Sequence, residues 1–392
     1  MFPTISHLIK YFTGIYIPLP VPTFGVFMVL AFTGAYWAFS EEFKRKEKQG
    51  IIFPFTQTII FGKSASIFSL LLYGTGGFFI GYKLIYCLIN YHLFELNPQS
   101  ILFSHYGNIV GGIIAGILSV FFKYIQNKQH KLEVSKIILR TVHPYQMMDK
   151  ILFWCGFFGF IGAILLGELE RIDALIKNPI QFFLTFNGLA FYGGLIFGAV
   201  TYLYITKRIG ITLSNAADIG SPGMMLAYGI GRIGCHLSGD GDWGIINIAP
   251  KPHWLSWLPS WMWAFNFPHN VIQQGKYIAG CTDNYCNELV NPVFPTSFYE
   301  AIICLLLFLL LWSIRRKIKI PGLMFSIFAI LNGIERFLIE HIKINVRYSF
   351  MGLHFTQAEF IALIICFIGI TSLYLSIAGN KEKTTSIYEN HN

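Results

Sequence analysis

Residues 298–314 read FYEAIICLLLFLLLWSI, and this stretch decides the class of fold. It carries one charged side chain, Glu300 near its start, and is otherwise mostly apolar. A helix needs about 20 mostly apolar residues to cross the hydrocarbon core of a bilayer, so the stretch predicts a membrane span. Eight further stretches have the same character, and the glycine-rich one at 219–237 is the weakest. The predicted spans are residues 23–39, 67–89, 101–125, 151–167, 180–206, 219–237, 298–314, 321–341 and 357–378.

The composition agrees with an all-α, polytopic membrane protein. Of 392 residues, 54% are apolar and only 12% are charged, whereas charged residues make up about 25% of an average soluble chain. These values exclude intrinsic disorder and argue against a water-soluble protein. The formal charge of +9 is typical of basic loops on the cytoplasmic side of a membrane, so we do not expect nucleic acid as a partner.

The distribution of Lys and Arg predicts the orientation of the chain in the membrane. With nine spans, most of these residues fall on one side, which the positive-inside rule assigns to the cytoplasm. The N-terminus and the Trp-rich segment 238–297 then face outward, and the C-terminus faces inward. We expect 238–297 to form a small extramembrane head. Within it, Cys281 and Cys286 are equally compatible with a disulfide and with two free thiols.

Several polar side chains are predicted at one depth in the outer leaflet. Ionisable groups in a span cost a few kcal/mol each, so each one needs a reason. Asn332, Arg336 and Glu340 recur every four residues on one helical face, and Arg232 lies at a similar depth in its own span. Neighbouring spans and their edges add further polar groups at this level: Asn187, His236, Tyr299, Glu300, Asp240 and Asp242. This convergence predicts a cavity with net positive charge.

Two guanidinium groups at one level suit a phosphate, because each presents a planar fork to anionic oxygens. Purely structural roles for these residues are an alternative to phosphate binding. Arg336 is also compatible with an ion pair to Glu340, Arg232 with snorkelling to head groups, and His236 with a helix-end contact to backbone. The few carboxylates and scattered cysteines give no reason to expect a metal or another cofactor.

At this point the chain resembles the bacterial prolipoprotein diacylglyceryl transferases. Residues 231–244, GRIGCHLSGDGDWG, are similar to the family signature Gly-Arg-Ile-Gly-Asn-Phe-x-Asn-Gly-Glu-x-x-Gly. Three more family motifs occur in order around it: YGGL at 192–195, FPTSFYE at 294–300 and NGIERFLIE at 332–340. The family has histidine where this chain has Tyr192, asparagine at Cys235 and Ser238, and tyrosine at Asn332.

The resemblance implies a seven-span core and therefore two additional spans. The implied organisation is an N-terminal segment with the first span (1–50), an insertion with the extra spans (51–145), the transferase membrane core with its periplasmic head (146–380), and a cytoplasmic tail (381–392). The implied location is the bacterial cytoplasmic, or inner, membrane.

The implied activity is transfer of an sn-1,2-diacylglyceryl group from phosphatidylglycerol to the lipobox cysteine thiol of a prolipoprotein, which releases glycerol phosphate. In this reading Arg232 binds the phosphate, and Arg336, oriented by Glu340, stabilises the leaving oxygen. Tyr192 and His236 are alternative acceptors of the thiol proton. The expected lipid-binding residues are Arg232, Gly193, Gly194, Asn187, Asp240, Tyr299 and Asn332.

Two other functions use some of the same features. A transporter or flippase for an anionic solute or lipid would line its path with the arginines, but the sequence shows no inverted repeat and no matched pair of broken spans. A metal-dependent membrane transferase would need several carboxylates at helical spacing. Gly193 and Gly194 are compatible both with close helix packing and with backbone approach to a lipid head group.

Overall fold

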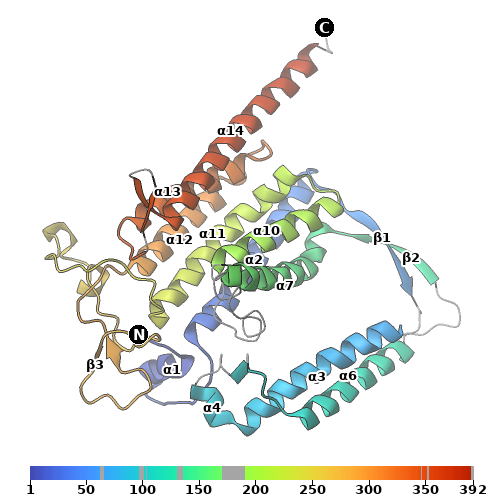
Figure 1. The fold of residues 1–392 in the computed structure, drawn as a ribbon. Coiled ribbons are helices and arrows are strands. Elements are labelled where there is room, and N and C mark those ends of the chain that lie inside the picture. Colours follow the sequence, from blue (N-terminus) through green and yellow to red (C-terminus); the bar gives the residue numbers. More distant parts are fainter. Residues whose placement is uncertain are drawn as a thin grey trace.

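The computed structural model describes residues 1–61, 66–96, 101–102, 104–129, 136–169, 190–345, 347–350 and 353–389. Helices dominate these residues, and most of the long ones form a bundle (Figure 1). The long helices are α2 (Thr23–Lys48), α3 (Ile67–Ile89), α6 (Ile109–Gln129), α7 (Met148–Leu169), α10 (Phe191–Arg208), α11 (Leu213–Ser238), α12 (Thr296–Ile314), α13 (Leu323–Glu340) and α14 (Gln357–Glu389). Two short helices are also present. Helix α1 (Ile5–Thr13) precedes α2, and α4 (Tyr91–Leu96) follows α3.

Six of the described helices are long and apolar enough to cross a membrane. They are α2, α3, α6, α7, α12 and α14, so the coarse prediction of a polytopic membrane protein is confirmed. Helices α10, α11 and α13 lie where spans were predicted but do not meet that standard. In α11 and α13 the reason is visible in the sequence, because Arg232 and Glu335–Arg336 interrupt their apolar character.

Local capping explains two differences between predicted and observed helix starts. The span predicted from residue 101 begins only at Ile109, because the Asn108 side chain accepts a hydrogen bond of 2.7 Å from the amide of Gly111. Helix α11 begins earlier than predicted, at Leu213, where Thr212 accepts from the amide of Asn215. Both helices start at a side chain that satisfies an otherwise unpaired amide.

The all-α prediction missed three small antiparallel sheets of two strands each. Strands β1 (Phe55–Phe61) and β2 (Lys136–Val142) pair from Phe55 opposite Val142 to Phe61 opposite Lys136. Both are rich in β-branched and aromatic residues, which favour strands. The other pairs are β3 (Lys276–Tyr277) with β4 (Asn287–Glu288), and β5 (Arg347–Phe350) with β6 (Leu353–Thr356).

Helix α11 occupies the middle of the bundle and packs against α2, α12, α13 and α10. Its glycines allow this close contact. A Cβ at Gly223 would lie 2.4 Å from a ring carbon of Phe39 on α2, so a larger residue would push the two helices apart. Because α11 lies among these helices, the Arg232 side chain can reach ion-pair partners on the neighbouring helices.

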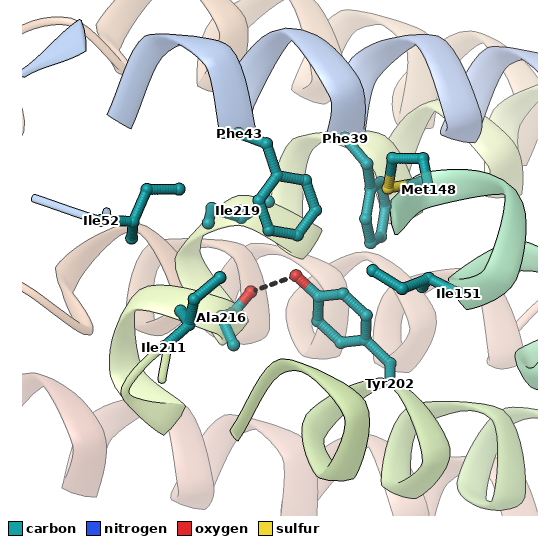
Figure 2. Close-up of a cluster of buried hydrophobic side chains, with 9 residues drawn as sticks. All are labelled: Phe39, Phe43, Ile52, Met148, Ile151, Tyr202, Ile211, Ala216 and Ile219. Atoms are coloured by element: carbon teal, nitrogen blue, oxygen red, sulfur yellow. Dashed lines mark hydrogen bonds between the residues drawn. The ribbon is translucent and has the colours of Figure 1, made fainter. Parts of the chain in front are cut away.

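A hydrophobic cluster joins α2, α7, α10 and α11 (Figure 2). Within it the Tyr202 hydroxyl donates a hydrogen bond of 2.8 Å to the carbonyl of Ala216, which satisfies the one polar group of the cluster. The nine side chains drawn are Phe39, Phe43, Ile52, Met148, Ile151, Tyr202, Ile211, Ala216 and Ile219. This cluster holds the bundle together at the end remote from residues 239–295.

Helices α3 and α6 pack against each other and lie beside the bundle, at the far end of the β1–β2 ribbon (Figure 1). Their contact is tight, since a Cβ at Gly81 would lie 2.3 Å from the Cβ of Ala115. A hydrogen bond from the Tyr91 hydroxyl to the carbonyl of Pro18 links this region to the N-terminal segment at 2.5 Å.

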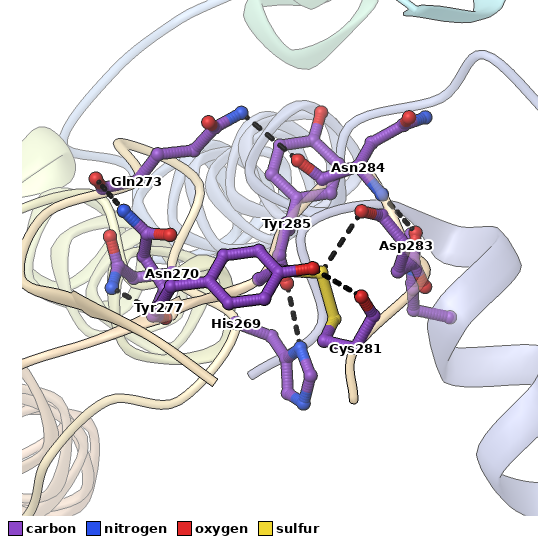
Figure 3. Close-up of a disulfide and its surroundings, with 11 residues drawn as sticks. His269, Asn270, Gln273, Tyr277, Cys281, Asp283, Asn284 and Tyr285 are labelled. Atoms are coloured by element: carbon purple, nitrogen blue, oxygen red, sulfur yellow. Dashed lines mark hydrogen bonds and ion pairs between the residues drawn. A yellow bond between two sulfur atoms is a disulfide. The ribbon is translucent and has the colours of Figure 1, made fainter. Parts of the chain in front are cut away.

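Residues 239–295, named the head segment here, connect α11 to α12 and are mostly irregular. Cys281 and Cys286 form a disulfide, which settles the alternatives left open by the sequence (Figure 3). Nearby, His269 Nδ1 lies 2.6 Å from the carbonyl of Tyr285. The loop is also tied to α1, because His7 Nε2 lies 2.9 Å from Asp283.

Candidate active site

A charged cluster lies where α11, α12 and α13 meet the head segment. Glu300, in the first turns of α12, has no exposed surface. Its carboxylate pairs with Arg232 from α11 through Nε at 3.1 Å and with Arg336 from α13 through Nη1 at 2.6 Å. The two arginines that the sequence placed at one depth are therefore brought together on a single buried carboxylate.

Three more charged residues complete this cluster. Arg336 Nη2 lies 3.2 Å from Glu340, one turn further along α13. Asp242 pairs with both Arg232 and Lys343. Lys343 Nζ also lies 3.2 Å from Glu300. We name Arg232, Arg336, Lys343, Glu300, Glu340 and Asp242 the head-end cluster.

The predicted net positive charge of this site is wrong for the structure as described. Arg232, Arg336 and Lys343 supply three positive charges, and Glu300, Glu340 and Asp242 supply three negative ones. The sequence placed Glu300 and Asp242 near the right depth but gave no information on their pairing. Burying charges without partners is costly, so the fold compensates each cation with a carboxylate.

Lys343 was missed as a site residue, because it lies beyond α13 and was counted among the loop cations. Its side chain is 3% exposed. Burial lowers the pKa of Lys343 to about 8, and the nearby Arg232 adds to this effect. The one signal available in the sequence was its position three residues after Glu340.

Tyr228 is a second residue that the sequence analysis missed. It lies one turn before Arg232 on α11, and the guanidinium carbon of Arg232 stands 5.0 Å from the centre of its ring. The hydroxyl is 3.4 Å from Glu300. The spacing of four residues from Arg232 was the available signal.

Two carboxyl groups on α13 differ in their surroundings. Glu340 is fully buried, pairs with Arg336 and also accepts from the side chain of Asn345. Glu335 is 4% exposed, and neither of its oxygens has a hydrogen-bond partner among the residues described. Asn332, half-buried, lies one turn before Arg336.

His236 packs among aromatic rings. It is 7% exposed, and its ring centroid lies 5.5 Å from that of Phe298, 5.6 Å from Trp261 and 5.6 Å from Phe267. Its Nδ1 has no hydrogen-bond partner in the described part of the chain. These contacts favour a packing role for His236 between α11 and the head segment.

Tyr192 and the two glycines after it start α10, on the side of the bundle formed by α7. A Cβ at Gly193 would lie 2.1 Å from the carbonyl oxygen of Gly162, so this glycine is needed for the crossing of α10 and α7. Gly194 faces Gly159 in the same crossing. Packing therefore accounts for Gly193, whereas a Cβ at Gly194 would make only ordinary contacts, the nearest at 3.5 Å. Tyr192 is half-buried beside them. Asn187 lies outside the described residues.

Tyr299 and Asp240 lie at the border of the cluster. The Tyr299 hydroxyl donates a hydrogen bond of 2.5 Å to the carbonyl of Met262, which fixes the head segment to α12. Asp240 accepts from the amide of Asp242 at 3.2 Å and so shapes the loop that presents Asp242. Burial raises the pKa of Asp240. Among the described residues, no group of three or more His, Cys, Asp or Glu is arranged to hold a metal ion.

Comparison with known proteins identifies the family. A family model described as prolipoprotein diacylglyceryl transferase matches residues 133–375, which contain every residue of the head-end cluster. The chain belongs to this family. The resemblance seen in the sequence motifs is thus confirmed, and the matched range leaves α3 and α6 outside the transferase region.

Relatives of this transferase come from distant bacteria. One from Xylella fastidiosa strain 9a5c is 27% identical over 237 residues, which cover 56% of this chain and 75% of the relative. One from Staphylococcus xylosus is 27% identical over 276 residues, or 69% of this chain and 84% of the relative. One from Thermus thermophilus is 31% identical over 173 residues, 43% of this chain and 59% of the relative. Each is named a phosphatidylglycerol–prolipoprotein diacylglyceryl transferase.

Proposed function

We propose that this transferase moves an sn-1,2-diacylglyceryl group from phosphatidylglycerol to the lipobox cysteine of a prolipoprotein. The observation that carries the proposal is the pairing of Arg232 and Arg336 on Glu300 inside the region matched by the family. The names of the relatives give both substrates. The transport alternative has no support from these names.

The reaction exchanges one bond to carbon for another. The thiol sulfur attacks the glycerol carbon that carries the phosphate ester, the carbon–oxygen bond breaks, and glycerol phosphate leaves with that electron pair. The thiol proton passes to an acceptor. Because the leaving phosphate gains negative charge, fixed donors at its oxygens stabilise the transition state. In this proposal Arg232 binds the phosphate and Arg336, oriented by Glu340, faces the leaving oxygen.

The neutral head-end cluster has to release a carboxylate before a phosphate binds. Glu300 and Glu340 have no exposed surface, whereas the Asp242 side chain is 23% exposed. Asp242 is therefore the carboxylate that exchanges most readily, and the phosphate takes its place on Arg232 and Lys343. Asp240 contributes by holding the loop of Asp242, and Tyr299 by holding the head segment.

The acceptor of the thiol proton is proposed to be Tyr192 or His236, as the sequence left it. Separate variants Tyr192→Phe and His236→Ala distinguish them, because removal of the true acceptor lowers transfer most at low pH, where little thiolate is present. Asn187, Asn332, Gly193 and Gly194 remain proposed contacts to lipid, although packing already explains Gly193.

The proposed arrangement in the inner membrane has nine spans, with the N-terminus and the head segment outside and the C-terminus inside. The nine long helices support the number, since each corresponds to one predicted span. The disulfide between Cys281 and Cys286 supports an outward-facing head, because such bonds persist in oxidising compartments. A cysteine placed at Ser256 should react with an impermeant thiol reagent in intact cells, and one at Lys319 should not.

The activity itself is tested with purified chain, phosphatidylglycerol and a peptide that carries a lipobox cysteine. A thioether-linked diacylglyceryl peptide detected by mass spectrometry is the expected product. Phosphatidylethanolamine in place of phosphatidylglycerol is the matched donor control and should give little product. No product with correctly folded protein and either lipid would overturn the proposed function.

A further inference from the structure

A second charged site lies at the end of the bundle remote from the head segment. There the ends of α2 and α12 enclose a cavity of about 350 Å³. Its lining includes the cations Lys44, Arg45, Lys48, Arg315 and Arg316. We name these five side chains, with Glu41 and the adjacent Glu42, the distal cluster.

Two of the guanidinium groups are held in place by one buried carboxylate. Glu42 is 1% exposed, and it pairs with Arg45 through Nη2 at 2.6 Å and with Arg315 through Nε at 2.8 Å. Arg315 also lies 3.2 Å above the ring of Trp312 and donates to the Trp312 carbonyl at 2.8 Å. These contacts hold both guanidinium groups in position, and Arg45 also donates from Nη1 to Gln49 at 2.9 Å.

The distal cluster carries an uncompensated positive charge. Glu41 pairs with Lys44 at 2.9 Å, and Glu42 offsets one of its two arginines. Lys48 and Arg316 are exposed, and within the described residues neither makes an ion pair. Five cations against two carboxylates leave three positive charges around one cavity. An anion that enters it relieves this repulsion.

Two tryptophans point to a lipid as the source of the anion. Trp37 on α2 packs against Trp312 on α12 with ring centroids 4.9 Å apart and the ring planes tilted by 34°, and Trp37 is 49% exposed. Tryptophan is enriched at the level of lipid head groups. Basic pockets between membrane helices at this level recognise phosphate-bearing head groups. A lipid bound there would place its phosphate on Lys48 and Arg316, beside the guanidinium groups of Arg45 and Arg315, and its acyl chains beside Trp37.

We propose that the distal cluster binds the phosphate of an anionic phospholipid in the leaflet opposite the head segment. This binding is separate from the transferase reaction, because the site shares no residue with the head-end cluster. Lys48 and Arg316 bind the phosphate, and the ordered guanidinium groups of Arg45 and Arg315 add positive charge beside it.

The proposal is tested by native mass spectrometry of the full chain titrated with dioleoyl phosphatidic acid. Wild-type protein should bind this lipid more tightly than dioleoyl phosphatidylcholine. The double variant Lys48→Ala/Arg316→Ala should bind phosphatidic acid about thirtyfold more weakly, since each basic residue near a lipid surface contributes roughly 1 kcal/mol. Both side chains are exposed, so the variant should fold normally.

The matched control is Lys207→Ala/Lys319→Ala, which removes the same charge from exposed positions outside the cavity. It should keep wild-type affinity. Equal loss in the two double variants, or no loss in the first, overturns the proposal. Displacement of the lipid by inorganic phosphate at equal concentration would identify free phosphate as the ligand and reject the lipid. The readout is binding alone, so failure here is independent of any failure of diacylglyceryl transfer.

Discussion

At the head end of the bundle Arg232 and Arg336 share the buried Glu300, and at the other end Arg45 and Arg315 share the buried Glu42. The two arrangements differ in their charge balance. The head-end cluster matches three cations with three carboxylates, whereas the distal cluster sets five cations against two.

The difference teaches that a pair of arginines does not by itself define an anion site. At the distal end an anion adds to an existing surplus of positive charge, because Lys48 and Arg316 have no ion-pair partner among the described residues. In the proposed reaction a phosphate replaces a carboxylate at the head end, and Asp242, whose side chain is 23% exposed, is the one expected to leave. The leaving phosphate gains negative charge during the reaction. A site in which phosphate displaces a carboxylate can therefore bind the transition state more tightly than the bound phosphatidylglycerol.

The largest expected effect is on transfer activity, and it distinguishes the head-end cluster from the distal cluster. Arg336→Ala should lower kcat for diacylglyceryl transfer by about 10²–10³-fold, the range seen when a fixed donor to a developing oxyanion is removed. Arg315→Ala removes the equivalent arginine from Glu42 and should leave transfer near wild type. The measurement is thioether product per unit time at saturating phosphatidylglycerol. Comparable loss in both variants would mean that the head-end cluster has no special role.

The next largest effect is on stability. It compares Glu300 with Glu42, each of which is shared by a pair of arginines. Glu300→Gln should lower the free energy of unfolding by about 3–5 kcal/mol, because it leaves buried cations without their common partner. Glu42→Gln should also destabilise the fold but by less, since Glu42 holds two cations against three for Glu300. Thermal unfolding in detergent gives both values. A Glu300→Gln variant as stable as wild type contradicts the pairing described.

The pH dependence of transfer should differ between Lys343 and a residue that cannot lose its charge. Lys343 has a pKa of about 8 in the fold, so it is charged below pH 8 and neutral above it. Transfer should therefore decline above pH 8 relative to Lys343→Arg, whose guanidinium stays charged.

The same pKa has the opposite effect on folding. Because the pKa of Lys343 is lower in the folded state than in the unfolded chain, the unfolded chain binds more protons from about pH 8 to the ordinary lysine value. The contribution of Lys343 to stability thus rises with pH in that window. Activity and stability profiles that move together would show that Lys343 acts only through the fold.

The smallest expected effect concerns the carboxylate that leaves. Asp242→Asn should lower KM for phosphatidylglycerol about threefold, because the phosphate no longer competes with an anion for Arg232 and Lys343. Glu288→Gln is the control, since Glu288 lies in the head segment and pairs with Lys276 instead of with either cation. An increase in KM for Asp242→Asn alone would instead place Asp242 in direct contact with the substrate.

The sequence by itself determined the membrane character, the positions of the long helices and the family. These properties depend on local composition and on motifs a few residues long, such as the apolar run at 298–314 and Arg336 with Glu340 on one face of α13. The sequence also placed Arg232 and Arg336 at one depth, because the rise of a helix is fixed.

Only the tertiary structure decided which charges meet. Glu300, Arg232 and Lys343 are far apart along the chain, and no helical period relates them. Their pairing made the head-end cluster neutral, and the rings around His236 and the crossing at Gly193 arose in the same way, from contacts between separate helices. The physical reason is that buried charges and close-packed surfaces are satisfied by neighbours in space, which a local pattern in the sequence does not encode.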